Sequence, residues 1–126
     1  MQYTVSKSED ESYIILKYHG DITREIAFKA AEDSHALGRV HGINRFLVDG
    51  TEAKNIESIL NNYKFAYDDV QQADIDSSAC VALLVRPDDK SHDFVETSLR
   101  NAGFDVTLFR DRDEAINHLL SSFQTK

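Results

Sequence analysis

The sequence is poor in several residue types, and each shortage excludes a class of protein. A single cysteine, Cys80, cannot form an internal disulfide, and it lies within an apolar run, which favours a small core side chain. The five glycines contain no GxGxxG or GxxxxGK spacing, so no phosphate-binding glycine loop is expected. The longest apolar run, Ala79 to Val85, falls far short of the roughly 20 residues of a membrane-spanning helix. The N-terminus lacks the apolar core of a signal peptide, which predicts a cytoplasmic protein without stable membrane insertion.

Basic residues are outnumbered by acidic ones. The 126 residues include 14 Lys and Arg against 22 Asp and Glu, a formal net charge of -8. Because scattered carboxylates repel phosphates, nucleic acid is not an expected partner. Apolar residues make up 41% of the chain and charged residues 29%, the composition of one globular domain over residues 1–126.

The stretch from Asn44 to Thr51 is the predicted centre of the fold. Phe46, Leu47 and Val48 are consecutive apolar residues, a pattern typical of a parallel strand that is covered on both faces. This strand ends abruptly in polar residues, and open α/β sheets place ligands at the carboxyl ends of their parallel strands. The loop that follows is therefore the first place to look for function.

Four residues of that loop form the predicted binding or switch site: Asp49, Gly50, Thr51 and Asn55. A phosphate on Thr51 would add about -1.5 to -2 charges beside the Asp49 carboxylate and would repel an acidic partner. The structural alternative is that Asp49 and Gly50 only make the turn, which both residue types favour.

The remaining patterns predict a mixed sheet. Alternating apolar residues predict a hairpin of two strands near residues 3–7 and 14–18. The elements expected after it are a helix from about Thr23 to Leu37 closed by Gly38, the central strand, a helix from about Asn55 to Val70, a strand at 79–85 stopped by Pro87, a helix capped by Ser91, a strand at 105–109 and a helix opened by Asp111. The fold class is α/β, a mixed β-sheet with helices in the order ββαβαβαβα.

The second helix carries two sets of apolar residues. Its main set repeats at spacings of three and four, and we expect it to face the core: Ile56, Ile59, Leu60, Tyr63, Tyr67 and Val70. Phe65 lies on another face, where it either packs against a neighbouring loop or belongs to an exposed patch for a partner.

The order of elements resembles the STAS fold of the anti-sigma-factor antagonists, and more closely the SpoIIAA-like group of small bacterial proteins, which is related to the CRAL-TRIO lipid carriers. The resemblance covers nearly the whole chain. It rests on four passages: Gly20-Asp21-Ile22-Thr23 before the first helix, RFLVDG at the end of the central strand, NAGFDVTLF leading into the last strand, and DRDEAINHLL in the final helix.

The resemblance implies a non-enzymatic regulatory module that binds a protein partner at the loop after the central strand. In the antagonists this strand ends in Asp-Ser-Ser-Gly, and an anti-sigma kinase phosphorylates the serine directly after the aspartate. Asp49 matches that aspartate, Gly50 occupies the phosphoacceptor position, and Thr51 provides the nearest hydroxyl. Self-association into a homodimer is compatible with this interpretation.

A carrier of a small apolar, lipid-like ligand is the alternative function. Tyr63, Phe65 and Tyr67 would then line an apolar pocket. A closed core with an exposed patch would favour the regulatory module, and a hollow between helix and sheet would favour the carrier.

Polar residues after the neighbouring strand form a second candidate surface: Arg86, Asp88 and His92, with Asp89 between them. Such a loop could bind a cation or pair an acid with an imidazole, although two aspartates before a helix are commonly a solvated turn. The other histidines show no zinc-ligand spacing: His19, His35, His41 and His118. No metal or cofactor is therefore expected.

Two further classes fit the sequence poorly. A receiver domain would begin with a strand followed by paired acids and would carry a lysine after its last strand, whereas this chain begins with a hairpin and has Arg110 there. A serine or cysteine enzyme would need a nucleophile on a glycine-flanked elbow beside a base, and the sequence has none. We therefore expect a protein that is not an enzyme.

Overall fold

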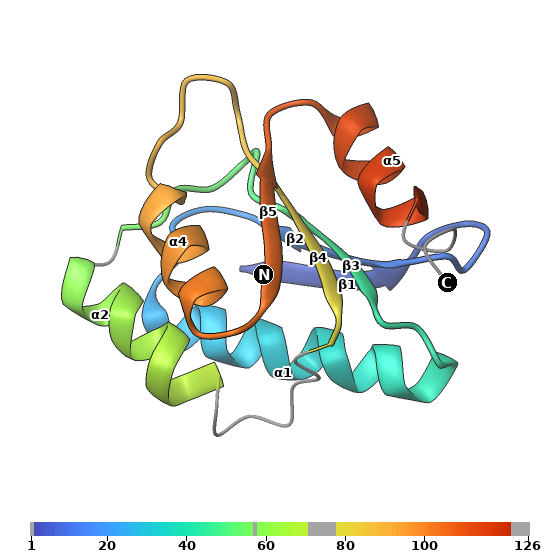
Figure 1. The fold of residues 1–126 in the computed structure, drawn as a ribbon, viewed down its shortest axis with the longest axis horizontal. Coiled ribbons are helices and arrows are strands. Elements are labelled where there is room, and N and C mark those ends of the chain that lie inside the picture. Colours follow the sequence, from blue (N-terminus) through green and yellow to red (C-terminus); the bar gives the residue numbers. More distant parts are fainter. Residues whose placement is uncertain (1, 57, 71–77, 122–126) are drawn as a thin grey trace.

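The computed structural model describes residues 2–56, 58–70 and 78–121. Figure 1 shows the elements. They are β1 (Tyr3–Lys7), β2 (Ile14–Tyr18), α1 (Arg24–His41), β3 (Arg45–Asp49), α2 (Ile59–Lys64), the π-helix η1 (Phe65–Asp69), β4 (Cys80–Leu84), α4 (Asp93–Asn101), β5 (Asp105–Phe109) and α5 (Arg112–Ser121). The predicted order of strands and helices is confirmed.

The strands form one mixed sheet of five in the order β1-β2-β3-β4-β5. β1 and β2 pair antiparallel as a hairpin, and the other neighbours pair parallel. β3 is the middle strand, with Phe46 opposite Ile14 on one side and Val81 on the other. Phe46 and Leu47 of its apolar run are buried and Val48 is partly buried, because helices cover both faces of the sheet, as the sequence predicts.

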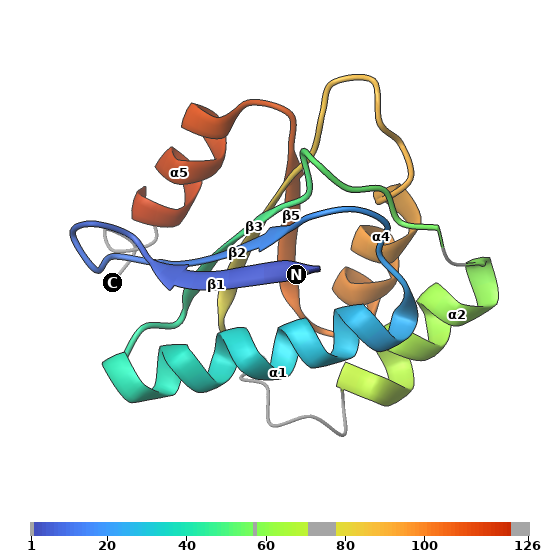
Figure 2. The same cartoon turned by 180° about the vertical axis from the view of Figure 1, so that it is seen from behind.

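The helices form two unequal layers, which Figures 1 and 2 show from opposite sides. α1, α2 and α4 cover one face, and α5 covers the other. On the α5 face, Ala115 and Leu119 pack on Leu47, Ala82 and Leu84 in a closed cluster. The α5 face is closed, and the space in which a ligand could be held lies on the opposite face, between the sheet and the layer of α1, α2 and α4.

α1 begins as predicted but ends later. Thr23 caps it by accepting a hydrogen bond from the Ile26 backbone N–H. The predicted end at Leu37 with Gly38 as the cap is wrong, because Gly38 lies inside the helix and the left-handed cap is Gly42, with φ 67°. Gly38 is there for a different reason: a Cβ at this position would lie 2.6 Å from the carbonyl oxygen of Ile43.

α2 begins later than predicted, and its buried face is different. Ser58 caps the helix by accepting from the Asn61 N–H, whereas Asn55 lies in an isolated β-bridge with Ile22. The turn after α2 is a π-helix, which rotates the following residues relative to an α-helical pattern. The buried side chains of this segment are Asn62, Phe65, Ala66 and Val70, while Ile56, Leu60 and Tyr63 are exposed, so the prediction that these last three face the core is wrong.

No helix among the described residues is long and apolar enough to cross a membrane.

Candidate functional site

Asp49 is the best-anchored side chain of the predicted site. It is 1% exposed, and its Oδ1 accepts from the Thr51 N–H at 2.9 Å and from the Thr51 hydroxyl at 2.6 Å. Its Oδ2 accepts from the guanidinium of Arg112, the first residue of α5, at 2.7 Å. Burial opposes ionisation, but the hydrogen bonds from Thr51 and Arg112 outweigh it, and the pKa of Asp49 lies below its usual value. Asp49 therefore acts as an ionised anchor that fixes the turn and docks α5.

Gly50 is buried beneath an imidazole ring. Its N–H donates to the Leu84 carbonyl at 2.8 Å, which ties the turn to the end of β4. A Cβ at Gly50 would lie 3.3 Å from Cε1 and Nε2 of His92. The close approach of His92 thus explains the glycine at the place where the antagonists carry the phosphorylated serine.

Asn55 connects the loop to two helices. Its backbone N–H donates to the Ser91 hydroxyl at 3.1 Å, just before α4, and its side-chain amide donates to the Asn62 side chain at 2.9 Å in α2. The prediction that Ser91 caps α4 is wrong, because the N-cap of this helix is His92. The Ser91 hydroxyl anchors the loop that contains Asn55 instead.

The structure separates the residues of the second candidate surface. Nε2 of His92 lies 3.5 Å from Oδ2 of Asp89, and both side chains are buried. Arg86 and Asp88 are exposed, 3.9 Å apart, and face solvent. Burial lowers the pKa of His92 and outweighs the opposing charge of Asp89, so the ring is neutral at pH 7. His92 consequently belongs with Gly50 and Asn55 rather than with an exposed cation-binding loop.

A cavity of about 140 Å³ lies between the sheet and the helical layer, beside His92 and Asn55. Its walls come from β2, β3, β4 and β5 on one side and from α1, α2, η1 and α4 on the other. The apolar lining comprises Leu16, Ile22, Ala27, Ala31, Phe46, Val48, Phe65, Val70, Ala79, Val81, Leu83, Val95, Leu99, Phe104 and Val106. The hollow that would favour a carrier is therefore present.

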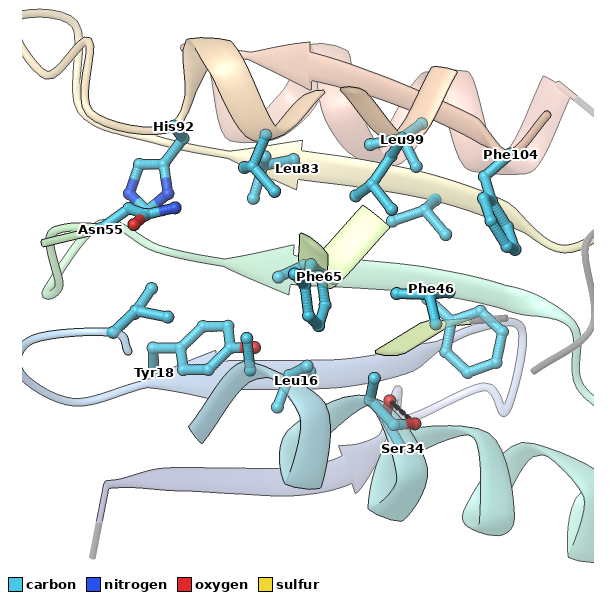
Figure 3. Close-up of a pocket in the computed structure, with 18 of the residues that line it drawn as sticks. Leu16, Tyr18, Ser34, Phe46, Asn55, Phe65, Leu83, His92, Leu99 and Phe104 are labelled. Carbon is cyan, nitrogen blue, oxygen red and sulfur yellow. Dashed lines mark hydrogen bonds between the residues drawn. The ribbon is translucent and has the colours of Figure 1, made fainter. Parts of the chain in front are cut away.

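The polar side chains His92 and Asn55 lie at one end of the cavity, and large apolar side chains lie toward the other end together with Ser34 and His35. Figure 3 shows His92 and Asn55 next to each other at one end, Phe65 in the middle, and Phe46 and Phe104 toward the opposite end. The lining polar residues also include Tyr18, Thr23, Arg24, Ser34, His35 and Asn62. Such an arrangement suits a ligand with a polar group at one end of an apolar body.

Only one of the three predicted aromatic residues lines this cavity. Phe65 is buried and points into it, whereas Tyr63 and Tyr67 stack on each other outside it, with ring centroids 4.4 Å apart. The expectation for Tyr63 and Tyr67 is wrong because the helix turns the side with Asn62, Phe65 and Ala66 inward, and Tyr63 and Tyr67 lie on its other side.

Sequence reasoning missed the residues that complete the site. Arg112 is the first residue of the final helix and carries no signal that pairs it with a distant aspartate. Tyr18, Leu99 and Phe104 have the pattern of ordinary core residues, and only the packing leaves space between them. An acid three residues before a histidine did indicate the contact between Asp89 and His92.

Comparisons with known proteins bear on the fold. Neither a protein-family model nor a curated protein matches the sequence. Among solved structures, the chain is similar to the crystal structure of an uncharacterised protein from the DUF3478 family with a SpoIIAA-like fold from Shewanella loihica PV-4. The match covers 93% of this chain and 91% of that chain, with a TM-score of 0.50 and 15% sequence identity.

The chain has a SpoIIAA-like fold. The resemblance predicted from the sequence is thus confirmed at the level of architecture. An identity of 15% shows the fold alone, so the partner, the ligand and the phosphorylation that the resemblance implied stay predictions.

Proposed function

We propose that this SpoIIAA-like chain is a non-enzymatic binding module that holds a small, uncharged amphiphile between its sheet and the layer formed by α1, α2, η1 and α4. The cavity of about 140 Å³ supports the proposal, because a hollow between helix and sheet is the feature expected of a carrier. Well-packed cores contain few voids larger than a water molecule, so a space of this size needs an explanation.

The volume limits the size of the ligand. An engineered cavity of about 150 Å³ in another protein, lined by aliphatic and aromatic side chains, stays dry and binds benzene. A ligand here would therefore have an apolar body of roughly one aromatic ring or a short alkyl chain. A full-length acyl chain would require the helical layer to move outward.

The charges at the cavity favour an uncharged head group. Arg24 is the one Lys or Arg among the described lining residues, and its Nε and Nη2 atoms donate to Asp69 at 2.6 and 2.7 Å. His92 is neutral at pH 7, as its lowered pKa requires. Because a buried anion needs a matching cation, a hydroxyl or amide group at Asn55 and His92 suits the site better than a carboxylate.

A binding role without catalysis is proposed because no Asp or Glu is among the described residues that line the cavity, and the acids in the loops near His92 have structural partners. Both oxygens of Asp49 accept hydrogen bonds, and Oδ1 of Asp89 accepts from the Ser91 N–H at 2.9 Å. An acid that anchors a turn is poorly placed to exchange protons with a ligand.

The experiment compares two substitutions of the same kind on α1. Ala31 lines the cavity and Ala36 is exposed, so Ala31→Leu fills the space while Ala36→Leu adds the same atoms on the outer surface. Binding of benzene, phenol and hexanoate is measured by shifts of backbone amide signals in heteronuclear NMR. The expected result is that benzene and phenol shift signals around the cavity in wild type and in Ala31→Leu far less, with Ala36→Leu behaving as wild type.

The three probes separate the parts of the proposal. Binding of hexanoate as tightly as phenol would contradict the uncharged head group and leave the cavity as a binding site. Absence of binding for all three probes, or equal binding by Ala31→Leu and wild type, would overturn the ligand-binding function itself.

Protein binding at the loop after β3 is a second candidate function. It is supported by an exposed apolar patch immediately after that loop: Ile56, Leu60 and Tyr63 are 56%, 59% and 49% exposed. His92 touches Gly50 of the loop and also lines the cavity, so an occupant of the cavity would contact the ring that packs on the loop. The two functions are therefore compatible in one regulatory module.

The test of this second candidate uses the protein purified gently from its own host and examined by native mass spectrometry. Leu60→Asp places a charge within the patch, and Val40→Asp places one at a remote residue that is 76% exposed. A stoichiometric second polypeptide that is lost from Leu60→Asp and kept by Val40→Asp would support protein binding. Its absence from wild type, or equal retention by both variants, would contradict it.

A further inference from the structure

Three side chains of metal-ligand type converge at the amino ends of β4 and β5, on the face covered by α5. Cys80 and Asp105 are the first residues of their strands and lie opposite each other in the parallel register. His118 lies in the last turn of α5, next to Leu119, which packs in the same cluster as Cys80. The thiol sulfur, a carboxylate oxygen and an imidazole nitrogen all lie within 4.8 Å of one another.

His118 supplies an independent observation at this place. Its Nε2 is buried and has no hydrogen-bond partner in the part of the chain that the structure describes. The ring packs against Phe109, with centroids 5.2 Å apart, so the nitrogen has an apolar neighbour rather than water on that side. A buried nitrogen without a partner is unfavourable, and a bound ion or water is the usual explanation.

We propose that Cys80, Asp105 and His118 bind a divalent transition-metal ion of the zinc type. Sulfur, imidazole nitrogen and carboxylate oxygen together form a donor set that Zn²⁺ accepts, whereas Mg²⁺ and Ca²⁺ prefer oxygen ligands alone. Ligand atoms of a tetrahedral zinc ion lie roughly 3.3 to 3.8 Å apart. The three ligand atoms lie within 4.8 Å of one another, so binding an ion requires side-chain rotations that shorten these separations, and Asp105 is the exposed member of the three.

The surroundings of the cluster fit a site that holds an ion at the surface. Cys80 is 8% exposed and His118 is half-buried, while Asp105 is exposed, so an ion would reach the site from the Asp105 side and keep a fourth position for water. Arg45, which pairs with Cys80 from β3, opposes the cation.

The cluster is separate from the cavity beside His92. It lies on the opposite face of the sheet, beneath α5, and none of its three residues lines the cavity. A metal there would clamp α5 to β4 and β5, close to the Leu119 cluster. The site thus bears on stability and does not depend on the proposed ligand.

Cobalt(II) is the probe for the test, with the full chain kept reduced by a thiol-free reductant. Because Cys80 is the only cysteine of the sequence, a thiolate-to-cobalt charge-transfer band reports on this residue alone. We expect the band to saturate at one cobalt per chain and to disappear when Zn²⁺ is added. His118→Gln and Asp105→Asn should each weaken cobalt binding at least about tenfold, the lower end of what even supporting groups contribute.

Two controls keep the outcome decisive. His41→Gln removes an exposed histidine from the end of α1 and should bind cobalt as wild type does. Asp105→Asn alters an exposed side chain, so its effect is not explained by loss of the fold. Absence of the charge-transfer band, equal cobalt affinity in His118→Gln and His41→Gln, or one cobalt per two chains would overturn the proposal.

Discussion

Replacing Asp49 by Asn tests whether this carboxylate anchors the turn and α5. The carboxylate accepts two hydrogen bonds from Thr51 and one from Arg112. Hydrogen bonds to a charged group contribute about 1.5 to 3 kcal/mol each, and the half-exposed Arg112 less than that. Asn keeps an acceptor for Thr51 but turns an amide donor toward the guanidinium, so we expect a loss of about 2 to 3 kcal/mol in the free energy of unfolding.

The pH dependence of stability gives a second readout of the same residue. The pKa of Asp49 in the folded state lies below its unfolded value, which is about 3.9. Its stabilisation is therefore fully present above the unfolded pKa and is lost as the pH falls through the folded pKa. The gap between wild type and Asp49→Asn should accordingly be widest near neutral pH and should narrow from about pH 5 downward.

Urea unfolding followed by circular dichroism, repeated across this pH range, measures both effects. Asp88→Asn is the matched control, because Asp88 is exposed and its ion pair with Arg86 is long, at 3.9 Å. This substitution should change the free energy of unfolding by less than about 0.5 kcal/mol. A loss below about 1 kcal/mol for Asp49→Asn at pH 7, or a gap that does not narrow in acid, would refute the anchoring role.

Three further substitutions test other parts of the structure. Gly38→Ala pushes a methyl group against a backbone carbonyl, so it should lower the urea midpoint and reduce the free energy of unfolding by about 1 to 3 kcal/mol. Gly42→Ala should cost less, because a methyl group there meets open space and only the positive φ of Gly42 disfavours it. Thr51→Ala removes one donor to the buried Asp49 carboxylate, so it should lower the free energy of unfolding by about 1 to 2 kcal/mol while circular dichroism shows an intact fold. It should also abolish phosphorylation of this loop, and labelling by a kinase-bearing lysate as strong as that of wild type would contradict this prediction. His92→Phe keeps the ring but removes its nitrogens, so by NMR titration phenol affinity should fall toward that of benzene, and an unchanged preference for phenol would exclude His92 from head-group recognition.

The predicted switch loop and the cavity meet at two residues, His92 and Asn55. From the sequence alone, the loop after the central strand and a pocket beneath the second helix are separate explanations of function. His92 packs on Gly50 of the loop and lines the cavity, and Asn55 belongs to both. A regulatory module that senses a ligand is consistent with this connection, and the two experiments proposed above test its two halves independently.

The sequence alone determined the elements whose signals are local. Strand β5 covers Asp105–Phe109 as predicted, and β4 lies within the predicted run at 79–85. Apolar alternation and unbroken apolar runs indicate whether one or both faces of a strand are covered. Thr23 fixes the start of α1 because its side chain caps the first turn of the helix. These features depend on residues close together in the chain, so they can be predicted without knowing the packing.

Tertiary structure alone decided the positions that depend on distant contacts. Packing turned the face with Asn62 and Phe65 inward and left Tyr63 outside, because helical spacing separates the two faces without saying which one is buried. The cavity exists because side chains from strands and helices across the sequence stop short of one another, and Cys80, Asp105 and His118 meet because parallel register and the return of α5 bring them together. Empty space and convergence are properties of the packed chain, since a single sequence records each side chain but not the distance between side chains far apart along it.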